Sequence, residues 1–271
     1  MRSLQIIFSL LQIASCAAFP AVCFADTILL DDFSTGLTFG GGTFYNSSNQ
    51  QIPSGSGNSY SAWGGNGGGT LNLNPGVTAR WVDTDVTNGI LGNTRTAEVK
   101  NASGTSRSSI TMVGGIDGNA NINSPVANVM CLTCFAYSFA PIDVMTHHIF
   151  YITFVGLDAT ARGNLQARLH FSDGANTAIA TLDTSAAVIG KNRFDLMGAL
   201  NWNSINRYAV TSAMIEFTSS TNGVDFVVDS LMFSINPEPG TFGVLSIAAL
   251  LVAGLSSQRR RNRSQRPENS D

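Results

Sequence analysis

The stretch from Leu165 to Asp183 alternates apolar and polar residues with a period of two, and this feature restricts the fold most. Apolar residues occupy every second position from Leu165 to Phe171, and polar residues lie between them. Successive side chains of a strand point to opposite faces, so this pattern predicts a strand with one buried face. Ser172-Asp173-Gly174 is typical of a tight turn, and residues 176–183 repeat the strand pattern. The stretch therefore predicts a β-hairpin.

Three further stretches predict strands. Residues 148–155 are almost continuously apolar, as expected for a central strand covered on both faces. Residues 208–219 and 224–235 predict two more strands, joined by a short polar link. No convincing amphipathic helix occurs outside the two terminal segments. The predicted fold class is therefore all-β, a two-sheet β-sandwich of jelly-roll type.

The last part of the chain has a different character from the rest. An uncharged apolar run follows two prolines, and arginines follow the run. Residues 241–257 would form a transmembrane helix about 25 Å long, just short of the roughly 30 Å hydrocarbon core. The arginines predict that the tail lies in the cytoplasm and that the preceding residues lie outside. The sorting motif is Pro237, Glu238, Pro239, Gly240 and Thr241, and the basic cluster is Arg259, Arg260, Arg261 and Arg263.

This order of motif, short apolar helix and arginines resembles the PEP-CTERM sorting signal of bacterial proteins, here over residues 236–264, with a polar tail at 265–271. The resemblance implies processing by exosortase near the Pro-Glu-Pro after transient anchoring in the inner membrane. It also implies release to the surface or extracellular matrix of a Gram-negative bacterium that makes exopolysaccharide. An ordinary single-pass anchor is the alternative.

The N-terminus predicts a signal peptide over residues 1–25. Arg2 precedes an apolar stretch, and small residues before the predicted cut between Ala25 and Asp26 suit signal peptidase. A rival interpretation is a lipoprotein box ending at Cys16. We favour the later cut, because a lipid anchor would make the C-terminal signal redundant.

Residues 26–235 then remain as one β domain. This body has nine Lys and Arg against fifteen Asp and Glu, a net charge of −6. Such a balance argues against nucleic acid as a partner, because phosphates require clustered cations. Residues 40–70 are rich in Gly, Ser and Asn and predict long loops over a sheet or a partly disordered segment.

A weaker resemblance concerns the two ends of the body. Residues 29–34 and 226–233 are similar to the first and last strands of galactose-binding-like and carbohydrate-binding-module jelly rolls, which commonly lie side by side. The resemblance implies that Asp31, Asp32 and Asp229 approach one another and hold a structural calcium. Carboxylates at strand ends, exposed to water, are the alternative.

Two other stretches place oxygen-bearing side chains at every second residue. One holds Asp83 and Asp85, and the other runs from Asp117 to Asn121. Both lack the glycine and glutamate of an EF-hand loop, so we interpret both as polar turns. Calcium is the one cofactor that the sequence leaves open.

Cys131 and Cys134 are the cysteines that remain after the predicted cleavage, and an oxidising exterior favours a disulfide between them. Residues three apart in an extended strand lie too far apart for a disulfide, so a pair requires a turn at 132–133. The alternatives are a redox pair, for which no helix N-terminus is indicated, and a zinc site, which lacks a second ligand pair.

No catalytic motif is evident, so we expect no enzyme activity. Glu98 and Glu216 lie outside any glycosidase motif, and no G-x-S-x-G sequence occurs. Trp63, in the Gly-rich stretch, is the candidate for stacking on a sugar, against the alternative of a packed residue. Three hypotheses remain: a non-catalytic surface or matrix protein associated with exopolysaccharide or biofilm, a carbohydrate-binding module with a defined sugar, and a secreted hydrolase of unrecognised type.

Overall fold

The computed structural model describes residues 27–39, 42–55, 57–62, 68–101, 107–115, 118–124, 133–219, 221 and 223–235. The chain divides into a compact unit, Thr27–Ile235, and a second unit made of Met1–Asp26 and Asn236–Asp271. The predicted signal peptide, sorting motif and transmembrane helix belong to the second unit and lie outside the described residues. Among the residues that are described, no helix has the length and apolar character needed to cross a membrane.

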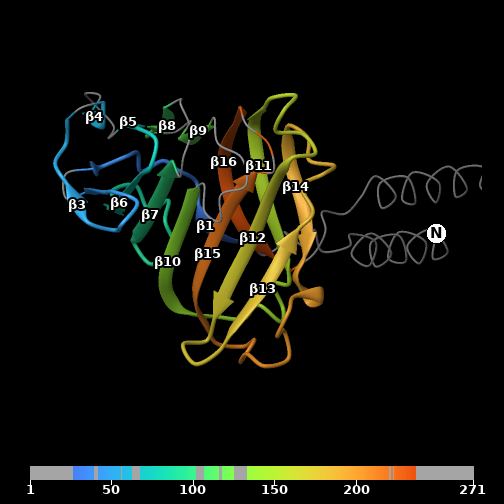
Figure 1. Cartoon of the computed structure of the whole chain (residues 1–271). Coiled ribbons are helices and arrows are strands. Elements are labelled where there is room, and N and C mark those ends of the chain that lie inside the picture. The colour runs from blue at the N-terminus through green and yellow to red at the C-terminus, as the bar shows by residue number, and fades with distance from the viewer. Residues whose placement is uncertain are drawn as a thin grey trace, which may run out of the picture. The chain divides into compact units, whose positions relative to one another are not determined.

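Thr27–Ile235 contains two antiparallel eight-stranded sheets (Figure 1). Strand β1 also belongs to sheet A, where it pairs with β16. The other strands of sheet A are, in order, β14 (Gly190–Asp195), β11 (Ile149–Leu157), β16 (Val224–Ser234), β9 (Asn119–Ser124), β8 (Ser108–Val113), β5 (Gly69–Leu73) and β4 (Ser59–Ala62), with β1 spanning Thr27–Asp31.

Sheet B contains the predicted hairpin at one edge. Its order is β13 (Thr177–Leu182), β12 (Leu165–Ser172), β15 (Val210–Ser219), β10 (Thr133–Ile142), β7 (Thr94–Asn101), β6 (Val77–Thr84), β2 (Thr43–Tyr45) and β3 (Gln51–Ile52). The described region includes a 3-10 turn, Leu196–Gly198, and no α-helix. The predicted all-β class and the sandwich of two sheets are confirmed.

The predicted strands occur close to their expected bounds. Strands β12 and β13 pair antiparallel, from Ala167 opposite Leu182 to Ser172 opposite Thr177, which confirms the hairpin. Strand β11 lies between β14 and β16, as expected for a central strand. Strands β15 and β16 follow each other in the sequence but belong to different sheets. The two strands therefore do not form a hairpin with each other.

The two ends of the unit meet in sheet A. Strand β1 pairs with β16 from Thr27 opposite Ser234 to Asp31 opposite Leu231, so the expected neighbourhood of first and last strands is present. The register shifts between Leu29 and Asp31. This bulge lets two consecutive residues, Leu30 and Asp31, be fully buried.

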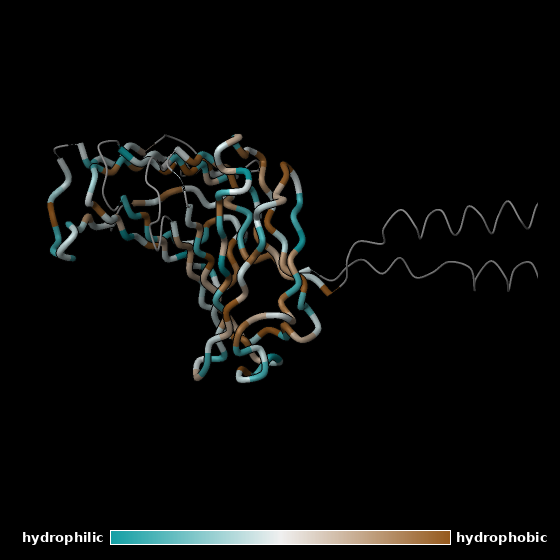
Figure 2. The backbone as a smooth tube through the Cα atoms, turned by 45° about the vertical axis from the view of Figure 1, so that its right-hand side comes forward, coloured by the Kyte–Doolittle hydropathy of each residue, from teal (hydrophilic) through white to brown (hydrophobic). Residues whose placement is uncertain are grey.

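The core lies between the two sheets and is built by period-two alternation. The burial of β12 alternates along the strand, and the hydropathy of the strands alternates in the same way (Figure 2). Aromatic residues from both sheets meet in this layer: Phe154 of β11 lies 6.5 Å from Phe217 of β15, measured between ring centroids. Phe217 lies 5.1 Å from Phe226 of β16. Edge-to-face and tilted contacts of this kind add to the energy of burial.

The Gly-, Ser- and Asn-rich region differs from the long loops that the sequence predicts. Its described residues form the short strands β2, β3 and β4, which extend the ends of both sheets. Phe44 of β2 and the ring of Tyr60 of β4 pack around Phe39, at 5.2 and 5.4 Å between centroids. A few aromatic residues are thus enough to anchor a stretch whose average composition is typical of a loop.

Candidate functional site

Two of the aspartates that the sequence offers as weak calcium candidates are the partners of a buried arginine. Arg95 has no exposed surface, and its Nη1 donates to Asp31 Oδ2 at 2.8 Å. Its Nη2 lies 2.9 Å from Asp83 Oδ2. Asp31 also accepts from the Tyr137 hydroxyl and from the Phe33 amide, each at 2.8 Å. These carboxylates hold a guanidinium, so a cation at this place would have to displace it.

Burial raises the pKa of Asp31, although Arg95, Phe33 and Tyr137 all act to lower it. For Arg95, burial would lower the pKa, but the charges of Asp31 and Asp83 outweigh that effect and raise it. Arg95 therefore remains protonated inside the core. The cluster is a charged structural centre of the sandwich, and the bulge at Leu30 is what turns Asp31 towards it.

The other weak calcium candidates take part in local structure. Asp85 Oδ1 accepts from the Thr87 amide at 2.8 Å and from the Thr35 hydroxyl at 2.9 Å. Asp32 Oδ1 accepts from the Ser34 amide at 2.9 Å, and Asp229 is half-buried on β16. Within the described ranges, no group of three or more His, Cys, Asp or Glu side chains is placed to hold a metal ion. Calcium binding stays a prediction.

Of the two cysteines predicted to pair, Cys134 is disulfide-bonded and buried on β10. Several other predicted site residues are not described by the structure. The residues outside the described ranges are Ala25, Asp26, Trp63, Cys131, Pro237, Glu238, Pro239, Gly240, Thr241, Arg259, Arg260, Arg261 and Arg263.

The outer face of sheet A carries two rows of polar side chains that cross five strands, from β16 to β4. The strand registers align one row as Asp225, Asn123, Ser109, Asn72 and Ser59. They align the next row as Val227, Asn121, Thr111, Thr70 and Ser61. Neighbouring strands are about 4.8 Å apart, so each row is about 19 Å long. Amides and hydroxyls thus form most of a regular array, which also contains one carboxylate, Asp225, and one apolar residue, Val227.

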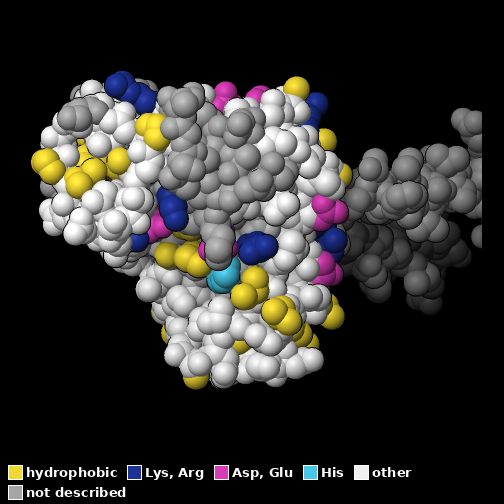
Figure 3. Space-filling model, in the orientation of Figure 1, with side chains coloured by type: hydrophobic (Ala, Val, Ile, Leu, Met, Phe, Trp, Pro, Cys, Tyr) yellow, Lys and Arg dark blue, Asp and Glu magenta, His cyan; other side chains and the backbone are white. Residues whose placement is uncertain are grey.

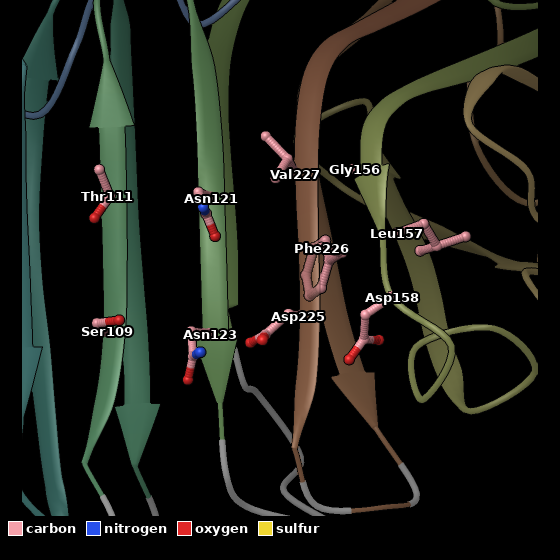
Figure 4. Close-up of a pocket in the computed structure, with 10 residues that line it drawn as sticks. All are labelled: Ser109, Thr111, Asn121, Asn123, Gly156, Leu157, Asp158, Asp225, Phe226 and Val227. Atoms are coloured by element: carbon pink, nitrogen blue, oxygen red, sulfur yellow. The ribbon is translucent and has the colours of Figure 1, made fainter.

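A groove of about 490 Å³ lies over the β16 end of these rows (Figure 4). Ser109 and Thr111 of β8, Asn121 and Asn123 of β9, and Asp225 of β16 line it, together with residues 156–158 and 226–227. Asn121 and Asn123 are exposed, whereas the alternating residues Ala120 and Ile122 are buried in the core. The alternation of β9 is therefore what presents the amides to the groove.

Two bulges shape the other wall of the groove. The pairing of β11 with β16 shifts register between Thr153 and Phe154, and again between Phe154 and Gly156. Gly156 then lies opposite Val227, and a Cβ atom on Gly156 would come within 2.8 Å of the Val227 Cγ2 atom. The absence of a side chain at residue 156 keeps this wall open.

Asp225 and Asp158 are the charged residues among those that line the groove. The Asp158 amide donates to the Asp225 carbonyl at 3.1 Å, and Asp158 Oδ1 accepts from the Ala161 amide at 2.5 Å. Burial raises the pKa of Asp225, the charge of Asp158 raises it further, and a hydrogen bond from Asn123 opposes the rise. The Oδ1 atom of Asp225 is buried and has no hydrogen-bond partner among the described residues.

The outer face of sheet B is chemically different. One row aligns Arg168 with Glu216, and Glu98 with Arg80, on either side of Cys134. Arg80 Nε lies 2.5 Å from Glu98, and His170 Nε2 lies 2.9 Å from Glu216. Figure 3 shows basic, acidic and histidine side chains near one another on the face drawn there. This row of sheet B thus presents paired charges, whereas the two rows of sheet A present amides and hydroxyls, and we take sheet A as the candidate face.

Two smaller pockets lie elsewhere on the unit. One, of about 350 Å³, lies over sheet B beside His170 and Met214. The other, of about 380 Å³, lies at the end of the sheets, where Phe39, Phe44 and Tyr60 line it with residues 51–54. These aromatic rings pack on one another and on Trp81, so they belong to the core. The pocket over sheet B contains a shorter row of four hydroxyl residues, Ser138, Ser212, Ser172 and Thr177, without the amides of sheet A.

The sequence predicted a polar turn from Asp117 to Asn121, and Asn121 lines the groove. In the structure, Asn119–Ser124 forms strand β9, so the alternation of oxygen-bearing residues indicated a strand. Asn, Ser and Thr favour turns on average, and this propensity hid the period of two. The apolar residues Ala120 and Ile122 between the asparagines were the signal that could have identified the strand.

No protein-family model matches the chain, and no curated protein sequence matches it. Among solved structures, it resembles the xylan-binding module CBM15, with a TM-score of 0.33 and 9% identity over 59% of this chain and 99% of that one. It resembles the glycoside hydrolase domain of Endo-D from Streptococcus pneumoniae R6, with a TM-score of 0.32 and 14% identity over 55% of this chain and 23% of that one.

A third similar structure holds the CBM22-1 and GH10 modules of the Clostridium thermocellum xylanase 10B in complex with xylohexaose. Its TM-score is 0.21 and its identity 15%, over 62% of this chain and 26% of that one. The chain thus spans about a quarter of the length of the two hydrolase structures. Carbohydrate-binding modules are thus among the solved structures that this chain resembles.

Proposed function

We propose that Thr27–Ile235 is a polysaccharide-binding β-sandwich that holds its ligand on the outer face of sheet A. The observation that carries the proposal is the pair of polar rows leading into the groove. Asn amides and Ser or Thr hydroxyls both donate and accept hydrogen bonds, as sugar hydroxyls do. An array about 19 Å long suits several consecutive units of a chain better than one small molecule.

The experiment is calorimetry with the full chain, purified in detergent, against four neutral polysaccharides: xylan, hydroxyethylcellulose, galactomannan and dextran. The proposal predicts saturable binding to at least one of them. It also predicts that oligosaccharides of that polymer bind more tightly as they lengthen, until they span the rows. Absence of binding to all four would overturn the proposal.

Trp63 remains the proposed stacking residue. It follows directly on Ala62, the last residue of β4, and Ala62 pairs with Gly69 of β5 next to the second polar row. A tryptophan that stacks on a sugar ring adds affinity, but its side chain is not packed in the core. Trp63→Ala should therefore weaken saccharide binding and leave the melting temperature unchanged. A lower melting temperature would instead indicate a packed residue.

The place of action that we propose follows from the chain's last residues. The body is exported, anchored transiently in the inner membrane, and released to the cell surface or matrix by an exosortase-type enzyme. Glu238→Ala should leave the tail uncleaved, so the protein would accumulate at full length in the membrane fraction. Glu268→Ala, in the polar tail, is the matched control and should mature normally. Normal maturation of Glu238→Ala would contradict this sorting route.

A second candidate function is hydrolysis of the bound polysaccharide, which the two carboxylates of the groove favour. Glycoside hydrolysis generally uses a pair of carboxyl groups, one of them with a raised pKa. Release of reducing ends that disappears in Asp225→Asn would support this candidate. Binding without release of reducing ends would leave the non-catalytic proposal standing.

A further inference from the structure

We propose that Asp158 and Asp225 make the groove selective for uncharged saccharide chains over chains that carry carboxylates. This inference rests on the proposed saccharide binding and adds a specificity to it. Both residues line the groove, one from β16 and one from the end of β11 (Figure 4). An anionic chain on the polar rows would therefore meet two carboxylates of the same sign.

No basic residue is among the described side chains that line the groove. The electrostatic influences on Asp225 are burial, Asp158 and Asn123, with no basic residue among them. Lys191, on the far side of β11, has its Nζ atom 4.2 Å from the centroid of the Tyr151 ring. Arg107, before β8, lies beside Gly57 and Asn74. Arg162 follows Asp158 in an exposed turn.

The undescribed segments within the unit add no positive charge. Between Thr27 and Ile235, the segments that the structure leaves undescribed contain no lysine or arginine in their sequence. They do contain one further acidic residue, Asp117, between β8 and β9. Apart from Asp225, the side chains of the polar rows are uncharged. The exposed Arg107 lies two residues before Ser109 of the first row, whereas both charged residues that line the groove are negative.

The test compares the neutral polysaccharide that the full chain binds with the carboxymethyl derivative of the same polymer, at pH 7 and low salt. The inference predicts that the carboxymethyl polymer binds about tenfold or more weakly, since like charges a few ångströms apart repel strongly in a partly buried site. In the double variant Asp158→Asn/Asp225→Asn, the ratio of the two affinities should fall towards one.

The matched control is Asp183→Asn/Asp195→Asn, which changes the net charge equally at two exposed residues away from the groove. This control should keep the wild-type ratio. Equal binding of the neutral and carboxymethyl polymers to the wild type, or the same ratio in the groove variant as in the wild type, would overturn the inference while the proposed binding stands. Failure to bind any neutral polymer would overturn both.

Discussion

Arg95 is a charged side chain with no exposed surface, and it connects residues that lie far apart in the sequence. Its guanidinium binds Asp31 of β1 and Asp83 of β6, and it donates to the carbonyl of Thr35 at 2.8 Å. Asp83 also accepts from the Trp81 indole at 2.8 Å. Each carboxylate therefore has several donors, which is the condition under which a buried ionic cluster is tolerated.

Arg95→Met should lower the free energy of unfolding by about 3–5 kcal/mol, because it leaves two buried carboxylates without a cation. Urea denaturation at pH 7 measures this loss. The deficit should shrink at pH 4, where protonation relieves the unpaired charges. Arg80→Met, at a largely exposed pair with Glu98, should cost less than about 1 kcal/mol. Equal costs at the two arginines would contradict this account.

Asp225 shows the opposite relation between charge and stability. Burial and the charge of Asp158 raise the pKa of Asp225 in the folded state. Protonation of Asp225 therefore stabilises the fold fully below about pH 4, the pKa of an unfolded aspartate. This stabilisation is lost as the pH rises through the folded pKa. Asp225→Asn should therefore stabilise the fold at pH 7, on the order of 0.5 kcal/mol after solvent screening, and should have no such effect at pH 3.

Thermal melting at both pH values measures this difference. Asp183→Asn is the control of opposite sign, since hydrogen bonds from Ser185 lower the pKa of Asp183. It should give no stabilisation at pH 7. A destabilised Asp225→Asn variant at pH 7 would show that the carboxylate has a favourable partner, and the charge argument for the groove would then fail.

At the scale of elements, the bulges of β11 and β16 shape the groove. A bulge bends a strand and redirects its side chains, and here Val155 between the shifted pairs is half-exposed. Gly156 follows it and faces Val227 across the ladder. The local irregularity, rather than the regular ladder, sets the width of the site.

Gly156→Ala should weaken saccharide binding and cost about 1 kcal/mol of stability, because its Cβ would press on the Val227 side chain. Calorimetry and melting of the same preparation measure the two effects. Gly198→Ala is the matched control, since a Cβ atom added there would meet nothing within 4 Å beyond its chain neighbours. Unchanged binding by Gly156→Ala would show that this wall does not touch the ligand.

The sequence predicted the strands in which apolar residues alternate clearly with polar ones, such as β12, β13 and β16. It did not predict β9, because asparagines every second residue are also typical of turns. The Arg95 cluster was equally hidden, since a pattern of residues shows which carboxylates are near in sequence but not which cation lies opposite them. Asp31 and Arg95 are brought together by a bulge and by sheet packing, and both depend on the tertiary structure.

At the scale of the whole unit, the two outer faces differ in kind. Sheet B pairs its charges across strands, while sheet A presents amides and hydroxyls beside two carboxylates. A protein that acts in a polysaccharide matrix needs hydrogen-bonding surface more than charge, and the body's composition agrees with that need. The proposed sorting tail would deliver such a surface to the place where polysaccharide is found.

The central claim is that the outer face of sheet A binds saccharide, and the affinity of Asn121→Ala/Asn123→Ala for the bound neutral polysaccharide tests it most directly. The two amides are exposed in the groove, and hydrogen bonds worth about 1 kcal/mol each predict a loss of about thirtyfold. Thr96→Ala/Gln166→Ala, at exposed strand residues of sheet B, should bind like the wild type. Unchanged affinity in the sheet A variant, or an equal loss in both variants, would contradict the claim.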